Sequence, residues 1–379
     1  MIHSFGKLVS KVLASRLAPF MKMLVAPNQT AFIRGRSILD SFKFVQSAAA
    51  LFRKKQIPKM LLKLDISKAF DTLSSAFLLE VLSALGFSAR WRDWIAILLG
   101  SASSRILVNG VPGDTISHRR GVRQGDSLSP LIFVLAMDSL NRLVDKAVEA
   151  GILHNLEIPQ VKYHCRLYAD DAILFASPSV QEASALKHLL HTFGTASRLT
   201  TNLGKCSISP IACPLEQLTL VAGTLGCAVV VLPITYLGLP LSSKALSRPK
   251  IHGLIDSVAN RLPSALGPML TRSGRLIWIK SVLTAVPLYA MMADHLPAWA
   301  RRDIERICRR FFWAGSDAST CGKCAVAWPI VTRPTSLGGL GVADLKLTSM
   351  ALQVRWLWLQ KQEDDRVWSG LQITVRKEV

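Results

Sequence analysis

Acidic residues are scarce in this sequence. Its 379 residues include 25 Asp and Glu but 46 Lys and Arg, which gives a formal net charge of +21. The deficit is largest near the N-terminus, where residues 1–60 hold eleven basic residues and a single acid, Asp40. A folded chain with this balance typically binds a polyanion, most often nucleic acid. Charge alone does not separate an enzyme that acts on nucleic acid from a ribosomal or chromatin protein.

Regularly spaced cysteines and a secretory leader are also missing. The seven cysteines are odd in number and irregularly spaced, which indicates a reduced, intracellular protein that is not secreted. Cys321 and Cys324 form a C-x-x-C pair, but neither a second pair nor a following histidine completes a zinc site. The cysteine pattern therefore gives little support to a structural zinc ion, and it leaves the role of this pair open.

A stretch without charge does not have the composition of a membrane helix. Residues 217–243 are uncharged and long enough to span a bilayer. However, turn-forming residues recur within them, including Gly223, Gly226 and Pro233, and such a density interrupts a membrane-spanning helix. We therefore expect strands in this stretch and no association with a membrane.

The stretch YHCRLYADDAILFA, residues 163–176, lacks the glycine that a tight turn between two strands usually needs. Its apolar runs predict buried strands at about 163–169 and 172–176, with Asp170 and Asp171 between them. Two carboxylates this close repel each other unless a positive group keeps them ionised. A bound metal ion would be such a group.

A third carboxylate follows another predicted strand. The apolar run from Met60 to Leu64 predicts a buried strand that Asp65 follows. Alone, Asp65 would be interpreted as a helix N-cap. Together with the Asp170-Asp171 pair, it predicts a site for Mg²⁺, which prefers carboxylate and phosphate oxygens. Two such ions would promote an in-line phosphoryl transfer.

Helices alternate with these strands, which indicates a mixed α+β chain. Apolar spacing predicts helices from Ser74 to Gly86, from about 89 to 99 with Gly100 closing it, and from Ser129 to about 150. Asn109-Gly110 predicts a hairpin turn. From about residue 244 onward the sequence is helical in character and basic.

Motifs in a fixed order make this sequence resemble the reverse transcriptase of LINE-type non-LTR retrotransposons, particularly those of the plant lineage. The motifs are LKLDISKAFD (62–71), RRGVRQGDSLSP (119–130), YADD (168–171), NLGKCSIS (202–209) and YLGLPLS (236–242). The segments PNQTAFIRGRSILDSF before them and GRLIWIKSVLTAVPLYAM after them are also similar to that family. The resemblance therefore covers nearly the whole chain.

The resemblance implies an α+β right-hand polymerase whose antiparallel palm sheet is backed by helices. The expected parts are partial fingers in residues 1–58, a palm in 59–243, a basic helical thumb in 244–315 and a C-terminal connecting segment in 316–379. The reverse transcriptase domain itself would span about 1–243. Because the sequence begins inside the fingers pattern and contains no endonuclease, we expect a truncated copy.

The implied activity is RNA-directed DNA polymerisation, in which two Mg²⁺ ions, with Mn²⁺ as an alternative, assist transfer of a dNTP to a primer 3′-OH. The implied partners are an RNA template, a DNA primer and dNTPs, with no stable protein partner indicated, and the implied location is the nucleus. A catalytically inactive, truncated nucleic-acid-binding remnant is the alternative. An RNA-dependent RNA polymerase is disfavoured by Phe70, and the motifs after the palm favour the LINE group over group II intron-type or telomerase-type enzymes.

The resemblance also implies roles for individual residues. Asp65, Asp170 and Asp171 would bind the metal ions, and Phe70 would block the 2′ position of the incoming sugar. Other residues expected to contact nucleotide, template or primer are Ile66 through its carbonyl, Gln124, Gly125, Tyr168, Lys205 as a proton donor to pyrophosphate, Arg34, Arg36 and the primer-gripping Tyr236-Leu237-Gly238. Ser127 departs from the family, which usually has proline there.

Overall fold

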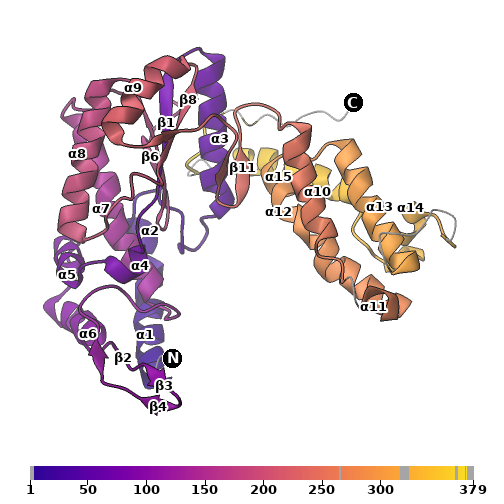
Figure 1. Ribbon diagram of the computed structural model, residues 1–379, viewed down its shortest axis with the longest axis horizontal. Helices are drawn as coiled ribbons and strands as arrows, with labels where there is room; N and C mark the ends of the chain where they lie inside the picture. The colour runs from indigo at the N-terminus through magenta and orange to yellow at the C-terminus, as the bar shows by residue number, and fades with distance from the viewer. Residues whose placement is uncertain (1–3, 264–265, 316–323, 363–365, 372, 374–379) are drawn as a thin grey trace. The chain divides into compact units, whose positions relative to one another are not determined.

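A computed structural model describes residues 4–263, 266–315, 324–362, 366–371 and 373 (Figure 1). The chain divides into two compact units. The first contains the residues up to Leu237 together with Arg366–Leu371, and the second contains residues 238–365 and 372–379. Each unit therefore consists of two separate stretches of the sequence.

A five-stranded sheet forms the centre of the first unit, in the order β6-β7-β1-β8-β9. Its strands are β1 (Lys59–Leu64), β6 (Cys165–Tyr168), β7 (Asp171–Ala176), β8 (Ser207–Ile211) and β9 (Ala228–Val229). Neighbouring strands are antiparallel except for β8 and β9, which are parallel. In the central strand β1, Leu62 pairs with Leu174 on one side and with Ile208 on the other. The predicted antiparallel sheet is therefore confirmed.

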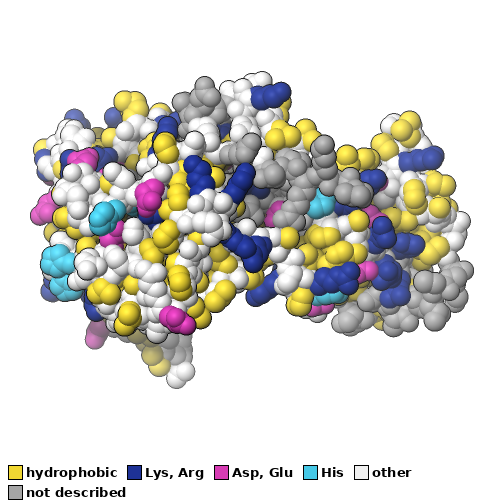
Figure 2. Space-filling view, turned by 90° about the horizontal axis from the view of Figure 1, so that it is seen from above, with side chains coloured by type: hydrophobic (Ala, Val, Ile, Leu, Met, Phe, Trp, Pro, Cys, Tyr) yellow, Lys and Arg dark blue, Asp and Glu magenta, His cyan; other side chains and the backbone are white. Residues whose placement is uncertain are grey.

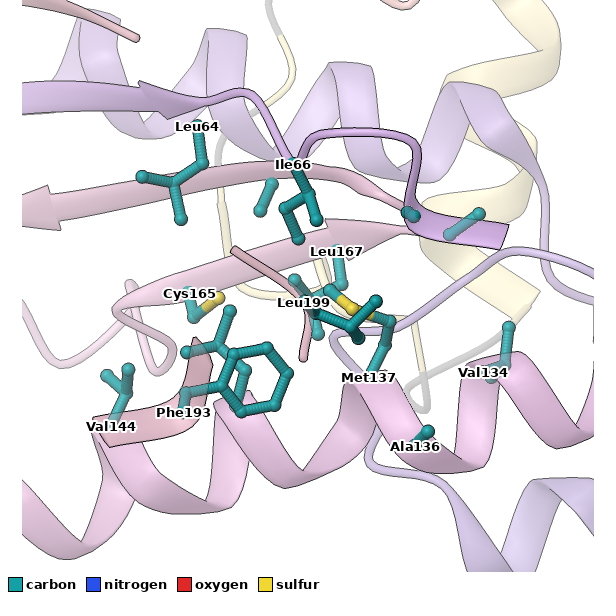
Figure 3. Packing of buried hydrophobic residues seen from close by; sticks show 14 of the residues in the cluster. Leu64, Ile66, Val134, Ala136, Met137, Val144, Cys165, Leu167, Phe193 and Leu199 are labelled. Carbon is teal, nitrogen blue, oxygen red and sulfur yellow. The ribbon is translucent and has the colours of Figure 1, made fainter. Parts of the chain in front are cut away.

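Helices cover both faces of this sheet, since alternate strand residues point to opposite sides. Leu64, Cys165 and Leu167 lie on the face toward α7 (Ser129–Glu149) and α8 (Val180–Ser197). Figure 3 shows Leu167 near Met137 and Cys165 near Phe193. Full burial of such apolar side chains stabilises the fold by about 1.5–3 kcal/mol each.

The opposite face of the sheet packs against α3 (Ile38–Lys54), where the rings of Phe52 and Phe175 lie 5.5 Å apart between centroids. Both rings are fully buried, so α3 is fixed to the sheet by aromatic contact as well as by buried area. The sheet therefore lies between two helical layers.

The remainder of the first unit consists of helices and small hairpins. Its elements are α1 (Ser4–Leu17), η1 (Ala18–Phe20), α2 (Met21–Leu24), α4 (Ala69–Thr72), α5 (Ser75–Ala84), α6 (Ala89–Gly100), β2 (Ser103–Ser104), β3 (Leu107–Val108), β4 (Val111–Pro112), β5 (Ile116–Ser117), α9 (Leu215–Leu225) and β10 (Ile234–Tyr236). The predicted helix after Ser74 is confirmed, because its hydroxyl accepts the N–H of Phe77 as an N-cap. Asn109 and Gly110 both have positive φ, as the predicted hairpin turn requires.

Two local expectations are wrong, and the end of one confirmed helix differs by a single residue. Residues 215–225 form the helix α9 where strands were expected, because Gly223 lies inside the helix and Gly226, with φ of +77°, ends it. The turn between β6 and β7 consists of Ala169 and Asp170, so that Asp171 already belongs to β7. Gly100 is the last residue of α6 rather than a residue beyond its end.

The second unit is largely helical, as expected. Its elements are β11 (Leu239–Leu241), α10 (Arg248–Ala259), η2 (Gly267–Met269), α11 (Arg272–Trp278), η3 (Ile279–Leu283), α12 (Ala285–Ala293), α13 (Ala298–Ala314), α14 (Trp328–Val331), η4 (Thr335–Leu337) and α15 (Leu345–Gln362). Its core includes the buried side chains of Leu283, Ile304 and Phe311. Figure 2 shows Lys and Arg side chains on its visible surface, in keeping with the predicted basic character.

Two features of the second unit concern earlier expectations. The continuous helical stretch Arg272–Ala293 is long and apolar enough to cross a membrane by length and composition alone. Its residues Ile279 and Leu283 are fully buried within the unit, but only 33% of its apolar window is buried. Of the C-x-x-C pair, Cys324 is exposed and Cys321 lies outside the described residues.

A short segment near the C-terminus, Arg366–Leu371, belongs to the first unit. We call it the return segment. Its Trp368 is fully buried and donates its indole N–H to Asp40 Oδ1 at 2.8 Å. Arg366 donates to the same oxygen at 3.0 Å, and the other Asp40 oxygen accepts the N–H of Ser37 at the start of α3. One buried carboxylate thus connects the return segment to the α3 N-terminus.

Candidate active site

The three predicted catalytic aspartates stand at one edge of the central sheet. Leu64, the last residue of β1, pairs with Ala172 of β7. The next positions on these antiparallel strands are Asp65 and Asp171, which therefore stand opposite each other. Asp170 occupies the turn immediately before Asp171, and all three side chains belong to half-buried residues. The fold brings the three carboxylates to the same end of neighbouring strands.

These carboxylates act on one another electrostatically. Burial raises the pKa of Asp171, the charges of Asp170 and Asp65 raise it further, and Lys63 opposes them. The Lys63 ammonium also donates to the carbonyl oxygen of Thr235 at 2.8 Å. The edge is therefore anionic, with one neighbouring lysine opposing the repulsion among three carboxylates.

An open cation site fits this edge better than a closed one. Across the described part of the chain, no three His, Cys, Asp or Glu side chains, the three aspartates included, are grouped so that they could hold a metal ion in an enclosed site. Mg²⁺ does not need such an enclosure, because it usually takes one or two protein carboxylates together with water and substrate phosphate. Asp65 and Asp171 are the pair that the strand register brings opposite each other, so the donor set fits an ion completed by substrate. Joint ligation by all three aspartates stays a prediction.

A loop after α8 holds the backbone of Asp65 in place. The N–H of Asp65 donates to the Cys206 sulfur at 3.3 Å, and its carbonyl accepts the N–H of Asn202 at 2.8 Å. Ile66 forms an isolated bridge with Thr201, so its backbone is fixed as well. Lys205 belongs to the same loop and is exposed. The sequence analysis did not identify Cys206, which positions Asp65 through a backbone contact that no motif reveals.

A buried glutamine braces the turn that carries Asp170. The Gln29 side-chain oxygen accepts the N–H of Ala169 at 3.2 Å and the N–H of Ala31 at 3.0 Å. Ala169 has a φ of +53°, which a residue with a Cβ adopts only when its surroundings enforce it. Gln29 is fully buried, and its hydrogen bond to Ala169 stabilises this conformation from a distant part of the sequence. It too was missed, because nothing in its local sequence links it to the turn.

Phe70, the expected sugar gate, lies in α4 and is half-buried. Its ring stacks on Phe133 of α7 with centroids 4.3 Å apart and an interplanar angle of 17°. Phe133 is fully buried, so one face of the Phe70 ring rests on the core. The position of the ring is thereby fixed, and its action as a gate stays a prediction.

The loop 119–125 is attached to the segment that contains Phe70. Val122 donates its N–H to the Phe70 carbonyl at 2.7 Å, and Gly121 donates to the Leu73 carbonyl at 2.8 Å. A Cβ at Gly121, which has a φ of +82°, would lie 2.7 Å from the carbonyl oxygen of Asp71. Only glycine permits this approach of one backbone to another. Gly121 therefore sets the distance between the loop and α4.

A side-chain hydrogen bond reinforces this attachment. Gln124 donates its amide N–H to Asp71 Oδ1 at 3.1 Å. Gln124 and the adjacent Gly125, whose φ is +84°, are exposed, as residues that receive a substrate must be. Asp71 is a further residue that the sequence analysis did not single out, although it ends the motif that begins at Leu62.

The remaining predicted residues differ in their surroundings. Arg34 is exposed. Arg36 is instead half-buried, and its guanidinium donates to the carbonyls of Ala26 at 2.8 Å and Gln29 at 2.7 Å. Arg36 thus holds the chain around Gln29. Tyr168 pairs with Asp171 at the end of β6 and is half-buried.

The predicted primer-gripping residues include one buried ring. Tyr236 is fully buried and stacks on Phe42 of α3 with centroids 6.4 Å apart. Leu237 and Gly238 follow it with φ values of +48° and +76°. If this motif contacts a primer, the contact is therefore made by Leu237 and Gly238 in the turn and not by the buried tyrosine ring.

Comparisons with known proteins agree with this arrangement. Residues 1–241 match the family described as reverse transcriptase (RNA-dependent DNA polymerase). The chain is 27% identical over 256 residues to a Pol polyprotein from retrotransposable element R2 of Popillia japonica, covering 65% of this chain and 41% of that protein. It is 24% identical over 366 residues to the R2DM Pol polyprotein of Drosophila melanogaster, covering 92% of this chain and 32% of that protein.

Among solved structures, the chain is similar to apo telomerase from Candida tropicalis, with a TM-score of 0.43 and 13% identity over 98% of this chain and 61% of that one. The chain spans less than half the length of the two R2 polyproteins. The R2 relatives confirm the resemblance to non-LTR retrotransposons, while the plant-like lineage stays a prediction. The family match covers more than half of the chain, includes the three aspartates, and confirms the α+β right-hand polymerase class. The chain belongs to the reverse transcriptase family.

Proposed function

We propose that this chain is the RNA-directed DNA polymerase region of a non-LTR retrotransposon, which transfers a dNTP to a primer 3′-OH on an RNA template. The observation that carries the proposal is the opposition of Asp65 and Asp171 at the sheet edge, with Asp170 beside them, inside the segment that matches the family. Reverse transcriptases depend on divalent metal ions, and we propose Mg²⁺, with Mn²⁺ as an alternative. Nuclear localisation stays a prediction.

We assign the residues of the site different roles in such a reaction. Asp65 and Asp171, with Asp170, would hold the metal ions, which when bound neutralise phosphate charge and activate the primer hydroxyl. Gln124 and Gly125 would orient the incoming nucleotide, since their loop is fixed to α4 through Gly121. Lys205 would donate a proton to the leaving pyrophosphate from the loop that holds Asp65. Preorganisation of this kind contributes much of the rate of polar reactions.

The expected parts of a right-hand polymerase are assigned here as proposals. Residues 59–243 would be the palm, 1–58 part of the fingers, 244–315 the thumb and 316–379 the connecting segment. The central sheet and its two helical layers support the palm assignment. The helical and basic character of the second unit supports a thumb that grips the backbone of a duplex.

Primer extension by the purified full chain tests the proposed function. With an RNA template, a DNA primer, dNTPs and Mg²⁺, we expect a product that DNase degrades and RNase does not. Removal of divalent ions with EDTA should stop the reaction, and ions added back should restore it. Binding of primer–template without any extension, in Mg²⁺ and in Mn²⁺, would instead identify the inactive nucleic-acid-binding remnant.

Substitution of Phe70 by Val tests the sugar gate. A rigid ring beside the sugar would leave a 2′-hydroxyl unpaired, which costs roughly 1–3 kcal/mol, or about five- to 150-fold in selectivity. Phe70→Val is therefore expected to raise incorporation of ribonucleotides relative to deoxyribonucleotides, as measured by the ratio of kcat/KM values. Because the Phe70 ring also stacks on Phe133, some loss of stability is expected in addition.

Phe133→Leu serves as the matched control for Phe70→Val. It removes the same stacking contact from the core side and leaves the Phe70 ring in place. We expect it to lower stability without changing the sugar preference. If both variants lose stability and keep the wild-type preference, Phe70 is a core residue and the gate lies elsewhere.

A further inference from the structure

A polar pocket of about 700 Å³ lies beside the loop 119–125 and is distinct from the aspartate edge. One wall is formed by the loop, and the other by Leu99 near the end of α6 and by residues 101–103 after it. None of Asp65, Asp170 and Asp171 is among the residues that line it. The volume is in the range of ordinary ligand sites, so the pocket can receive a group of substantial size.

The charges of this pocket favour an anion. Arg120, Arg123 and His118 line it, against a single carboxylate, that of Asp71. Asp71 already accepts a hydrogen bond from Gln124, which moderates its charge toward the pocket. The two arginines and His118 therefore face a single carboxylate, which already accepts one hydrogen bond.

Several of the donors are held in place without a ligand. Arg123 donates to the Ser101 hydroxyl at 3.0 Å, and a ring nitrogen of His118 lies 2.9 Å from the Ser104 hydroxyl. The short sheet of β2 and β5 joins the two walls, because Ser103 pairs with Ser117. Across the described residues, no hydrogen bond or ion pair involves the Arg120 side chain, so its guanidinium is available to a ligand.

This donor set matches a phosphodiester backbone. Proteins contact nucleic-acid phosphates largely through arginine and hydroxyl groups, and arginine and serine side chains are among the residues that line this pocket. No Phe, Tyr or Trp side chain lines it, so it offers no surface on which a base would stack. Gln124, which we propose to orient the incoming nucleotide, also lines the pocket, but Asp65, Asp170 and Asp171 do not. A triphosphate placed for reaction at those aspartates would therefore lie mainly outside the pocket.

We propose that this pocket binds phosphate groups of a polynucleotide strand, whatever the base sequence of that strand. Arg120 and Arg123 would make the contacts. The proposal rests on the proposed function for the identity of the strand, which would be the template. A strand held there would contact the same loop that carries Gln124, so its phosphates would be fixed close to the point of nucleotide selection.

The test compares Arg120→Ala/Arg123→Ala with the matched double variant Lys146→Ala/Lys162→Ala in the full chain. Lys146 and Lys162 are exposed residues of the first unit that do not line the pocket. Affinity for a labelled RNA-template–DNA-primer is measured by fluorescence anisotropy between about 50 and 200 mM salt. Loss of two phosphate contacts should make the slope of log K against log salt shallower by about 1.4–1.8.

Three further measurements keep the result interpretable. Arg120→Lys/Arg123→Lys, which retains both charges, should recover most of the slope, and circular dichroism should show that all variants are folded. The KM for dNTP should stay within about twofold, less than 1 kcal/mol, because no triphosphate is bound in the pocket. A raised KM with an unchanged slope would mean that the pocket holds a free triphosphate and would overturn the proposal.

An unchanged slope in the arginine double variant, or an equal loss in the lysine control, would also overturn it. The anisotropy measurement needs no catalysis. A chain that fails to extend primers but shows the arginine-dependent slope would therefore refute the proposed polymerase function and leave the phosphate pocket supported. If the wild-type chain extends primers and the arginine variant keeps an unchanged slope, the polymerase function is supported and the phosphate pocket is refuted.

Discussion

An Asp170→Asn variant is expected to extend primers at least about 10²- to 10³-fold more slowly than the wild type, which is the usual cost of losing one preorganised electrostatic contact. Asp170 stands in the β6–β7 turn beside Asp171, so its charge is part of any cation site at the sheet edge. Binding of primer–template should be retained, because the basic residues that we propose to bind the backbone lie elsewhere in the chain. Single-turnover extension and anisotropy together separate the two effects.

The same variant is expected to melt at a higher temperature than the wild type in the absence of divalent ions. Burial raises the pKa of Asp171, and the charges of Asp170 and Asp65 raise it further, which means that both carboxylates repel that of Asp171 in the folded chain. Removal of one charge relieves that repulsion. Added Mg²⁺ should therefore stabilise the wild type more than it stabilises Asp170→Asn.

Asp93→Asn is the matched control, since Asp93 is an exposed carboxylate on α6. It should change stability by no more than about 0.5 kcal/mol and leave extension unchanged. Full extension by Asp170→Asn would refute the assignment of Asp170 to the catalytic site. A lower melting temperature for Asp170→Asn than for the wild type would refute the repulsion at the sheet edge.

The largest effect on stability is expected from Trp368→Ala, at about 3–5 kcal/mol in the free energy of unfolding of the first unit. Trp368 is fully buried, and its indole N–H is hydrogen-bonded to Asp40. The substitution leaves a cavity and also removes one partner of a buried carboxylate. Because Asp40 caps α3, the start of that helix should also lose protection in hydrogen exchange.

Urea unfolding followed by circular dichroism measures this effect. Trp358→Ala is the matched control, because Trp358 lies on α15 with 57% of its surface exposed and should cost no more than about 0.5 kcal/mol. Trp368→Phe should fall between the two, since it keeps most of the buried area and loses the N–H donor. Equal stability of Trp368→Ala and Trp358→Ala would show that the return segment does not contribute to the folded first unit.

The parts of the fold that the sequence predicts are those governed by local chemistry. Ser74 begins a helix because its hydroxyl satisfies a free N–H, and Asn109-Gly110 makes a hairpin because both residues tolerate positive φ. The carboxylate edge was also predictable, since apolar runs locate strand ends. Family motifs then added roles that composition and periodicity do not provide.

What the sequence did not reveal depends on contacts between distant segments. The turn at Ala169 has no glycine, and its positive φ is maintained by Gln29, far away in the chain. Gly223 did not break α9, because burial of Leu218 and Leu225 outweighs the cost of about 1 kcal/mol for a glycine inside a helix. The hydrogen bond between Gln124 and Asp71 likewise exists only once the loop has packed on α4.

The return segment separates two ideas that are often treated as one, the extent of a family match and the extent of a folding unit. The match to the reverse transcriptase family covers residues 1–241, yet the compact unit containing most of them also includes Arg366–Leu371. A protein shortened to the matched residues would lack the Trp368 side chain that fills its own core. Residues 238–365, which make up most of the second unit, therefore separate two pieces of the first unit in the sequence. Expression boundaries drawn from sequence similarity alone would divide a hydrophobic core.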